Sequence, residues 1–485
     1  MTWLQSGRSA PCRGVRFRVL TMRLAACCSA IFLALAIGAT PALADEKDGL
    51  PEQSIATSLD GGPDKDARAA LAAKGVTYGI NYIGEVWSSS GGREDVTTYL
   101  GRLEILVDAD LEKLWGAKGL TFHVNGYQIH GAGLEKYLGY PFDYISSIEA
   151  LPSTRLFELW LEQKFGESVS VRAGQLAVDA EFFTTDTGGK FLNSSFGWPA
   201  IWANNLPNGG NAYPLATPGA RVKVEMTDNL TFLGAIYNGN PAGCEDGQRC
   251  NRNGTDFRVQ DPPFVIEEIQ YKYNQRAKDG DKGDGKGGGK KDRDKEKASS
   301  DVLSLPGVIK FGAWQHFGNF KDAYSATLID NGVNVARRVY SGNYSFYAMI
   351  DQQIYALPDD PEKGVFAFAR VAGAPSDRNL IAFYIDGGVF LKGYVPNRPD
   401  DTFGAAIDYV LVSGDASRAD RYLRDYEDSS YRVRNFEAVA EVFYKFQIAP
   451  GFAIQPDLQY MWNPAGGVAE NKDAVYGGVR VSIAY

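Results

Sequence analysis

The chain has 485 residues, a formal net charge of −9 and a pI of about 5.2. Three histidines and five cysteines leave little material for zinc or iron–sulfur centres, and the acidic pI argues against a general nucleic-acid binder. Glycine is frequent, with 54 residues, about 11% against a usual ~7%, and aromatic residues make up 12%. This mixture favours β-structure with many tight turns.

The N-terminus has the three parts of a secretory signal peptide. Residues 1–44 contain five arginines and no acidic residue, and the apolar run Leu24–Ile37 precedes the small-residue sequence Ala42-Leu43-Ala44. These parts mark a signal that is removed after export, here by cleavage near Ala44. Losing the five arginines changes the formal net charge from −9 to −14. The chain is therefore predicted to be exported and acidic.

Other interpretations of this segment are weaker. Residues 24–27 resemble a lipobox, but lipidation requires the apolar region before the cysteine, whereas here it follows. The apolar run is also shorter than the ~20 residues that span a bilayer. Because Met22–Ala44 alone has the length of an ordinary signal, a start at Met1 or at Met22 leads to the same exported chain.

Two cysteines, Cys244 and Cys250, remain after export. An even pair in an oxidising compartment favours a short disulfide loop. Metal binding by the pair is the weaker alternative, because no further Cys or His lies nearby in the sequence to complete a site. No cofactor is expected.

From Gly75 onward apolar and polar residues alternate, which is typical of strands whose two faces meet different environments. In residues 76–82 the apolar side chains occupy even positions, and in residues 103–111 they occupy odd ones. The pattern recurs in residues 157–162, 169–173, 221–226, 383–392 and 437–446. A soluble β-sandwich would alternate as well, so alternation alone does not decide the fold class.

Three features favour a membrane barrel over a sandwich. Many polar faces carry charges of both signs, as a water-filled lumen tolerates. The apolar faces often end in aromatic residues, as at residues 344–346 and 443–446, which is typical of the girdles at a membrane interface. The last strand, Val475–Tyr485, alternates up to a terminal aromatic residue, the form of an outer-membrane assembly signal. We therefore predict an all-β fold, a transmembrane antiparallel barrel in a Gram-negative-type outer membrane.

The expected barrel covers residues 75–485 and has about sixteen strands. The mature chain of about 441 residues allows 14 to 18 strands at roughly 25 to 30 residues for each strand with its connection, and even numbers are usual. A barrel of that size encloses an aqueous channel. Residues 45–74 form an N-terminal segment with a short helical candidate from Asp64 to Lys74, after Pro63.

Two long segments interrupt the alternation. Residues 184–218 are rich in Gly, Pro and Asn and too long for a turn, which indicates a functional loop. Residues 276–300 are a Lys/Asp/Gly stretch of low complexity, predicted to be a disordered surface loop.

Several long strings occur in a fixed order between about Leu71 and Tyr485. They include LFELWLEQ at 156–163, FLNSSFGWP at 191–199, AYPLATPG at 212–219 and QPDLQY at 455–460. Together they resemble the OprB-type carbohydrate-selective porin family. The resemblance implies a 16-stranded outer-membrane barrel through which small sugars diffuse passively. The stretch 276–300 and the Cys244/Cys250 pair depart from the resemblance.

A selective sugar channel needs fixed hydrogen-bonding groups for hydroxyls and aromatic rings for the CH faces of the sugar. The inward faces of the predicted strands supply both. The predicted channel contacts are Arg102, Glu104, Glu158, Trp160, Arg172, Gln175, Arg221, Trp314, Arg370, Tyr384 and Asp386. Acids opposite bases would keep the channel polar but nearly neutral, which favours sugars over ions. For each charged residue, membership of a wall network is the alternative to sugar contact.

Residues 184–218 are the candidate for a loop that folds inward and constricts the channel. They carry Phe191, Phe196, Trp198 and Trp202. These aromatic residues either contact the sugar or pack the loop against the barrel wall.

Other function classes are less favoured. Glu158 and Glu162 resemble a glycosidase pair, but four residues along one strand separate them by about 13 Å, beyond the roughly 5 to 9.5 Å of such pairs. No Gly-x-Ser-x-Gly motif is present, so no enzyme is expected. A plugged receptor barrel would need a whole domain where only residues 45–74 precede the first strand. A general, non-selective porin on the same fold stays open.

The expected partners are small carbohydrates, outer-membrane lipid and, through the strand that ends in Tyr485, the barrel-assembly machinery. No nucleic acid is expected. The identity of the sugar, a homotrimer against a monomer, and weak calcium binding by acidic loops stay open.

Overall fold

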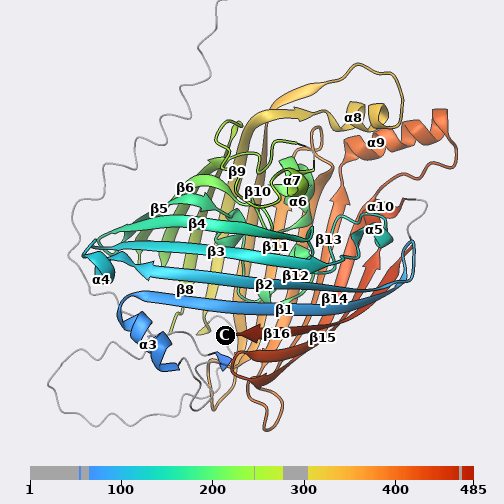
Figure 1. Ribbon diagram of the computed structural model, residues 1–485. Helices are drawn as coiled ribbons and strands as arrows, with labels where there is room; N and C mark the ends of the chain where they lie inside the picture. The colour runs from blue at the N-terminus through green and yellow to red at the C-terminus, as the bar shows by residue number, and fades with distance from the viewer. Residues whose placement is uncertain (1–53, 56–64, 245, 277–303, 469–471) are drawn as a thin grey trace, which may run out of the picture. The chain divides into compact units, whose positions relative to one another are not determined.

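The computed structural model describes residues 54–55, 65–244, 246–276, 304–468 and 472–485. In this part of the chain sixteen antiparallel strands form one closed barrel (Figure 1), which confirms the predicted fold class. The predicted signal peptide, most of the segment 45–74 and nearly all of the stretch 276–300 lie outside the described residues. The short helix expected near the N-terminus is present as α3 (Lys65–Ala73).

Each strand pairs with its neighbours in the chain, so the sheet is a simple up-and-down meander. The strands are β1 (Val76–Gly91), β2 (Thr97–Asp110), β3 (Leu120–Gly131), β4 (Ser153–Phe165), β5 (Val169–Leu176), β6 (Thr217–Thr227), β7 (Leu230–Asn238), β8 (Pro263–Tyr273), β9 (Gly307–Lys321), β10 (Val339–Ala356), β11 (Gly364–Gly373), β12 (Ile381–Lys392), β13 (Thr402–Val412), β14 (Phe436–Ala449), β15 (Phe452–Trp462) and β16 (Ala474–Ala484).

The helices that follow α3 lie in the connections between strands. They are α4 (Leu111–Trp115), α5 (Glu135–Leu138), α6 (Ala200–Asn205), α7 (Gly247–Cys250), α8 (Ala323–Asp330), α9 (Gly414–Tyr422) and α10 (Pro464–Gly467), with single turns η2 (Val178–Ala180), η3 (Gly188–Lys190), η4 (Ser194–Phe196), η5 (Pro207–Gly209) and η7 (Leu423–Glu427). Among the helices of the described residues, none has both the length and the apolar character needed to cross a membrane.

The barrel closes between its first and last strands. β16 pairs with β1 from Asn81 opposite Ala484 to Gly91 opposite Ala474. The backbone of Tyr485 continues this ladder, because its N–H donates to the Ile80 carbonyl at 2.9 Å. A closed sheet has no unpaired edge, and a sheet in hydrocarbon cannot tolerate one because no water is present to satisfy the edge.

The connections at the two ends of the barrel differ in length. One end has several tight turns, including residues 166–168, 228–229 and 450–451, and we call it the turn end; the connection of residues 274–306 is also at this end. The other end carries long connections, of which two matter below: loop L2 (residues 132–152) joins β3 to β4, and loop L3 (residues 177–216) joins β5 to β6. In outer-membrane barrels short turns face the periplasm and long loops face the outside.

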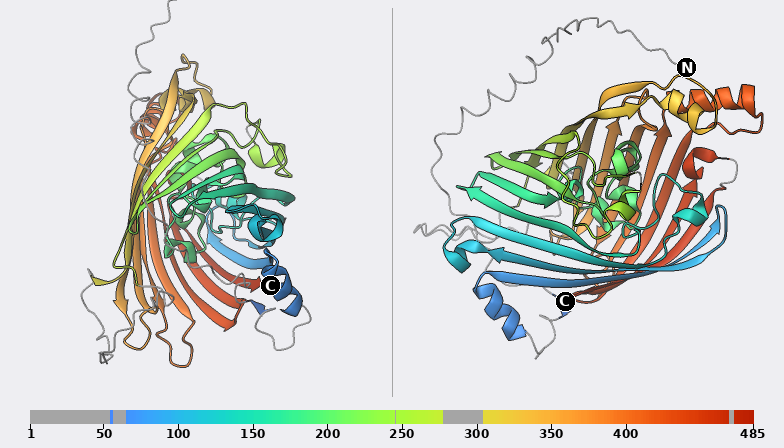
Figure 2. Two further views of the ribbon diagram at one scale, coloured as in Figure 1. Left: turned by 90° about the vertical axis from the view of Figure 1, so that its left-hand side faces the viewer. Right: turned by 45° about the horizontal axis from the view of Figure 1, so that its top comes forward.

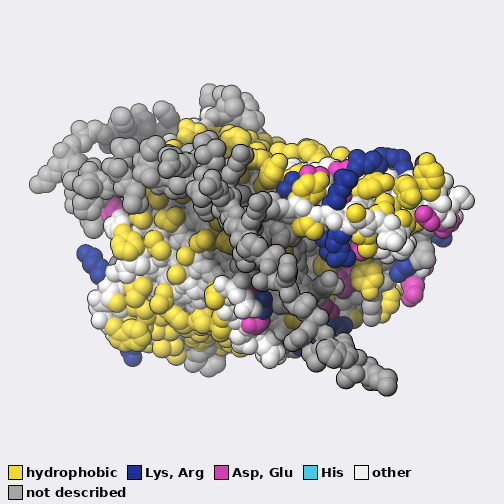
Figure 3. Space-filling model, turned by 90° about the horizontal axis from the view of Figure 1, so that it is seen from above, with side chains coloured by type: hydrophobic (Ala, Val, Ile, Leu, Met, Phe, Trp, Pro, Cys, Tyr) yellow, Lys and Arg dark blue, Asp and Glu magenta, His cyan; other side chains and the backbone are white. Residues whose placement is uncertain are grey.

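The outer face of the wall is apolar. Ile105, Phe346, Ile407 and Leu458 are all more than half exposed on it, and their neighbours along each strand point inward. Aromatic pairs mark the outer face near strand ends, for example Tyr460 with Trp462, whose ring centroids are 4.6 Å apart. Figure 3 shows hydrophobic side chains over much of one face, with charged side chains gathered at the right, over α8 and α9. An apolar, aromatic-rimmed outer wall is the surface that lipid requires.

A charge placed on this outer face should destabilise the folded barrel. We expect Ile407→Arg on β13 to lower the free energy of unfolding in lipid vesicles by about 2–4 kcal/mol, the cost of a basic side chain near the bilayer midplane. Urea titration followed by tryptophan fluorescence measures the change, with Ile407→Val as the matched control. An unchanged midpoint for the arginine variant would mean that this face does not contact hydrocarbon.

Candidate functional site

Loop L3 lies inside the barrel and is hydrogen-bonded to strands far from its own (Figure 2). The backbone N–H of Phe183 donates to Glu268 on β8 at 2.9 Å, and that of Thr187 donates to Asp351 on β10 at 2.8 Å. Asn193 reaches Gln459 on β15 at 3.1 Å. L3 thus crosses the lumen from β5 and β6 to the opposite wall. Its boundaries, 177 and 216, differ from the expected 184 and 218, because 177–183 have already left β5 and the ladder of β6 begins at Thr217.

Arg370 is the central anchor of L3. It stands directly opposite Asp386 on the neighbouring strand, and its Nε donates to that carboxylate at 3.0 and 3.1 Å. Its two Nη groups donate to carbonyls of L3 at 2.7 to 3.0 Å, those of Phe183, Ser195 and Gly197. The side chains of Arg370 and Asp386 have no exposed surface. These contacts tie the middle of L3 to β11 and β12.

The burial of Arg370 contradicts part of the set of channel contacts that was predicted from the sequence. Arg370, Asp386 and Tyr384 were expected to contact sugar, but L3 covers all three, and the Tyr384 hydroxyl donates to Asp386 at 2.7 Å. A side chain sealed behind a loop cannot meet a diffusing solute. These residues hold the loop in place.

Wall carboxylates bind the backbone of both inward loops. Glu441 accepts the N–H groups of Leu192 and Asn193 at 2.6 and 2.8 Å. Glu437, four residues before Glu441 on β14, accepts the N–H groups of Phe142 and Asp143 in L2 at 3.0 and 2.8 Å. A charged acceptor makes stronger hydrogen bonds than a neutral one, so each carboxylate fixes two consecutive loop residues. Sequence reasoning placed both glutamates on an inward face but did not link them to loops.

The aromatic residues of L3 pack the loop against the wall. Phe191 and Phe196 are buried against Phe368 on β11, with ring centroids 5.9 and 6.2 Å away. Trp202 is buried against Trp314 on β9. Trp198 is only partly buried, and its indole N–H donates within the loop to the Gly209 carbonyl at 2.8 Å. Of the two roles considered for these aromatic residues, packing is therefore the one observed, and Trp314 is likewise buried.

Charged residues of β4, β5, β6 and L3 pair with one another on one side of the lumen. Arg172 donates to Glu162 at 2.7 Å, and Arg221 donates to Glu181 of L3 at 2.8 Å and to Glu162 at 3.3 Å. The side chains of Arg172 and Glu181 are 16% and 22% exposed, whereas Arg221 is buried. Two cations and two anions thus make a polar surface with little net charge, which we call the paired-charge wall.

Trp160 on β4 packs against Arg172 of the paired-charge wall. The guanidinium carbon of Arg172 lies 3.8 Å from the centroid of its ring, and the His123 ring stacks on it at 4.8 Å with an interplanar angle of 18°. His123 belongs to β3 and Arg172 to β5, the strands on either side of β4, so the Trp160 ring lies between them. The ring contacts with Arg172 and His123 make Trp160 a support for Arg172.

The other predicted contacts divide into exposed and covered residues. Arg102 lies over the rings of Tyr127 and Tyr213 at 4.7 and 5.2 Å and stays partly exposed. Glu104 is also partly exposed and accepts hydrogen bonds from two wall asparagines. Glu158 and Gln175, by contrast, are buried.

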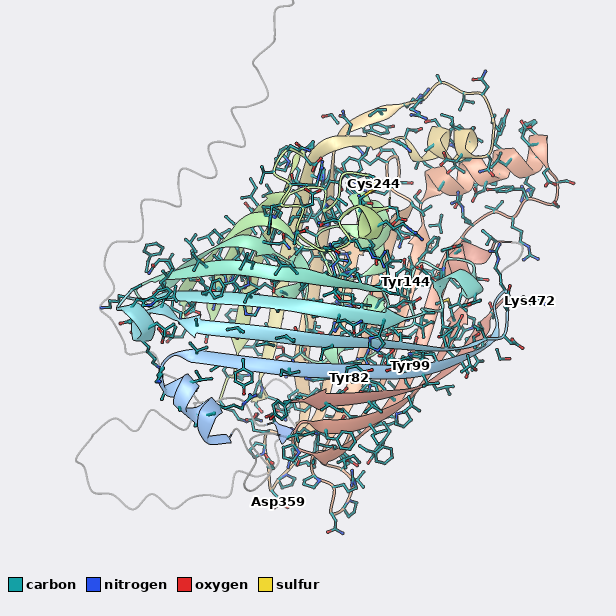
Figure 4. All side chains as sticks on the ribbon, viewed as in Figure 1. Tyr82, Tyr99, Tyr144, Cys244, Asp359 and Lys472 are labelled. Atoms are coloured by element: carbon teal, nitrogen blue, oxygen red, sulfur yellow. A yellow bond between two sulfur atoms is a disulfide. The ribbon has the colours of Figure 1, made fainter. Side chains whose placement is uncertain are left out.

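Glu158 and Gln175 hold loop backbone. Glu158 accepts the N–H of Ala177, the first residue of L3, at 3.0 Å. Gln175 donates to the carbonyl of Gly254 at 2.9 Å, in the connection between β7 and β8. That connection contains the disulfide between Cys244 and Cys250, and Figure 4 labels Cys244 near the loop-bearing end.

No cluster suited to a metal ion is found in the described residues, where no three His, Cys, Asp or Glu side chains come together in a suitable arrangement. His316 on β9 is buried and hydrogen-bonds the Gly239 carbonyl at 2.8 Å.

A closed sixteen-stranded barrel with an apolar outer wall, an inward loop and a charged lumen defines an outer-membrane diffusion channel, a porin. The family model "Carbohydrate-selective porin, OprB family" matches residues 95–485, and the chain belongs to this family. This confirms the resemblance that the sequence strings indicated, and it places the protein in the outer membrane of a Gram-negative bacterium.

Known relatives agree with this family. Porin B of Pseudomonas aeruginosa is 24% identical over 448 residues, which cover 86% of this chain and 89% of that protein. The putative porin QuiX of Acinetobacter baylyi is 22% identical over 451 residues, 88% of this chain and 86% of that one. The high-pH structure of Pseudomonas putida OprB covers 87% of this chain and 98% of its own, with a TM-score of 0.72 and 20% identity, and so shares the fold.

Removing the Arg370 guanidinium alone should lower the free energy of unfolding more than removing both members of its ion pair. We expect Arg370→Met to lower the free energy of unfolding by about 3–5 kcal/mol, because it leaves Asp386 charged, buried and unpaired. The double variant Arg370→Met/Asp386→Leu should lose less, since no unpaired charge remains. Urea titration of both variants tests this, and a single variant as stable as the wild type would contradict the anchoring role.

The carboxyl groups of L2 should make stability depend on pH. Burial raises the pKa of Asp143 to about 7 and that of Glu149 to about 8. An acid whose pKa is raised on folding keeps its proton in the folded state while the unfolded chain loses it, so the free energy of unfolding falls as pH rises from about 4 to 7 or 8. We therefore expect lower stability at pH 8 than at pH 5.

The variant Asp143→Asn should reduce this pH dependence, because an amide carries no titrating proton. Asp359→Asn, on an exposed turn labelled in Figure 4, is the matched control and should leave it unchanged. Urea midpoints at pH 5, 6.5 and 8 measure the slope, and identical slopes for wild type and Asp143→Asn would contradict the prediction.

Proposed function

We propose that small sugars diffuse passively through the lumen beside L3, and that the partly exposed residues of the paired-charge wall are the ones they contact. The observation that carries this is the balance of that wall, in which Arg172 and Arg221 meet Glu162 and Glu181 within 2.7 to 3.6 Å. Membership of the carbohydrate-selective porin family supports the same conclusion.

A balanced wall suits a neutral, hydroxyl-rich solute. An ion gains little from a surface whose charges already neutralise one another, whereas a sugar hydroxyl can donate to a carboxylate and accept from a guanidinium at once. Arg172, Glu181, Arg102 and Glu104 keep exposed surface and are the proposed sugar contacts. The other eight predicted contacts are covered or used as support, and they act through the positions of L3, of Arg172 and of the connection between β7 and β8.

We propose no catalytic activity. The carboxylate pair considered for glycoside hydrolysis is fully engaged, because Glu158 binds the backbone of L3 and Glu162 binds two arginines. A general porin on the same fold is the alternative that the transport experiment below distinguishes.

Further parts of the proposal concern export and assembly. Residues 1–44 are proposed to be the cleaved signal peptide, and β16 with Tyr485 the strand that the barrel-assembly machinery binds. The apolar outer wall is proposed to contact outer-membrane lipid, and a homotrimer is the assembly to test against a monomer by cross-linking in the membrane.

Transport assays test the function directly. In liposome swelling we expect faster entry of glucose than of amino acids of similar size, and in planar bilayers we expect added glucose to block the ion current. Arg172→Gln removes a charged hydrogen-bond donor worth about 1.5–3 kcal/mol, so the half-blocking glucose concentration should rise roughly tenfold or more.

The control is Arg418→Gln on α9, whose side chain is 60% exposed outside the lumen. Equal entry of all solutes would indicate a general porin, and no entry of any solute would reject the channel function.

A further inference from the structure

A cavity of about 840 Å³ lies under L3 at the turn end of the barrel. The tip of L3, residues 186–190, borders it on one side, and the turn at residues 450–451 borders it on another. The remaining lining comes from strands β11 to β16, the part of the wall farthest from the paired-charge wall. The cavity and the paired-charge wall are therefore different places in the lumen.

Three lysines line this cavity: Lys190 of L3, Lys392 of β12 and Lys445 of β14. None of their amines has a hydrogen-bond or ion-pair partner among the described residues, in contrast to Lys310, which bonds the Thr184 carbonyl at 2.6 Å. Arg480, also in the lining, is paired with Glu85 at 2.5 Å. The lysines thus leave positive charge available within the cavity.

The acidic residues of the lining do not cancel this charge. Glu362 is 76% exposed and pairs with Arg276 at 3.2 Å, and Asp400 is 63% exposed and lies 4.0 Å from Lys363. Both belong to turns at the mouth of the cavity. Asp186, at the tip of L3, is the third acid and is exposed. Acids that are solvated or already paired screen the inner lysines weakly.

An aromatic surface lies beside the lysines. Phe366 on β11 is partly exposed in the lining, and its ring lies 6.0 Å from that of Phe390 on β12. Phe390 and Phe443 on β14 are buried and form the base of the lining behind it. The hydroxyl of Ser482 and the amide of Gln455, which donates to the Lys190 carbonyl at 3.4 Å, add polar groups to the same lining. Apolar rings suit the CH face of a pyranose, the polar groups suit its hydroxyls, and the lysines suit an anionic substituent.

We propose that this cavity binds anionic monosaccharides, sugars that carry a carboxylate or a phosphate, with the ring against Phe366 and the anionic group among Lys190, Lys392 and Lys445. The inference rests on the proposed sugar channel, since the ligand must reach the cavity through the lumen. It extends the substrate class from neutral sugars to their acids and phosphate esters.

Block of the ion current in planar bilayers tests the proposal, with the solute added from the turn end at low salt. We expect glucuronate and glucose 6-phosphate to block at concentrations roughly tenfold below that of glucose. Lys445→Gln and Lys392→Gln should each raise the half-blocking concentration of the two anions several-fold and leave that of glucose unchanged. Lys190→Gln repeats the test on an exposed loop residue in case a strand variant fails to fold.

Two controls separate this cavity from other sources of anion block. Lys321 lies at the end of β9 away from the turn end, so Lys321→Gln should change the half-blocking concentration of neither glucose nor the two anions. Inorganic phosphate should block less well than glucose 6-phosphate, and equal block would overturn the carbohydrate part of the proposal. Equal shifts for glucose and glucuronate in the lysine variants would overturn the anion part. Glucose entry into liposomes by the wild type reports separately on the channel itself, so failure of the channel function is distinguishable from failure of this site.

Discussion

One buried guanidinium holds the interior of this barrel together. All five N–H groups of Arg370 are used, on Asp386 across the neighbouring strand and on three carbonyls of L3. A charge removed from water is tolerable only when its counter-ion and its remaining hydrogen bonds are supplied. The wall supplies the counter-ion and the loop supplies the carbonyls, so the ion pair and the inward position of L3 depend on each other.

The same requirement explains where the other charges lie. Backbone N–H groups of L2 and L3 leave water when the loops enter the barrel, and Glu437, Glu441 and Glu268 accept them. These three glutamates therefore serve to hold the loops in place. On β4 and β5, Glu162 is buried and neutralises Arg172, which stays partly exposed, whereas the lysines under L3 have no such partners. The lumen thus has one region in which positive and negative charges are paired and another in which lysines are unpaired.

The alternation of apolar and polar residues predicted the barrel, because the two-residue side-chain period of a strand is a local property that can be recognised before the fold is known. The terminal strand and the inward direction of Arg102, Arg172 and Trp160 follow from it, whereas the helix α3 was predicted from the proline before it. The site was predicted less well. Arg370, Asp386 and Tyr384 point inward as expected, but L3 covers them, and the contact of Arg370 with Ser195 joins residues 175 positions apart, which no local pattern records.

The sequence by itself determined the architecture, the family and the apolar outer wall, since each depends on periodicity and on strings of adjacent residues. Only the tertiary structure decided which inward side chains reach the channel. Inward direction is a property of one strand, whereas exposure depends on L3 and L2 folding back across the barrel and on the partners they take there. The position of L3 in turn depends on contacts between residues far apart in the chain, such as Asn193 with Gln459.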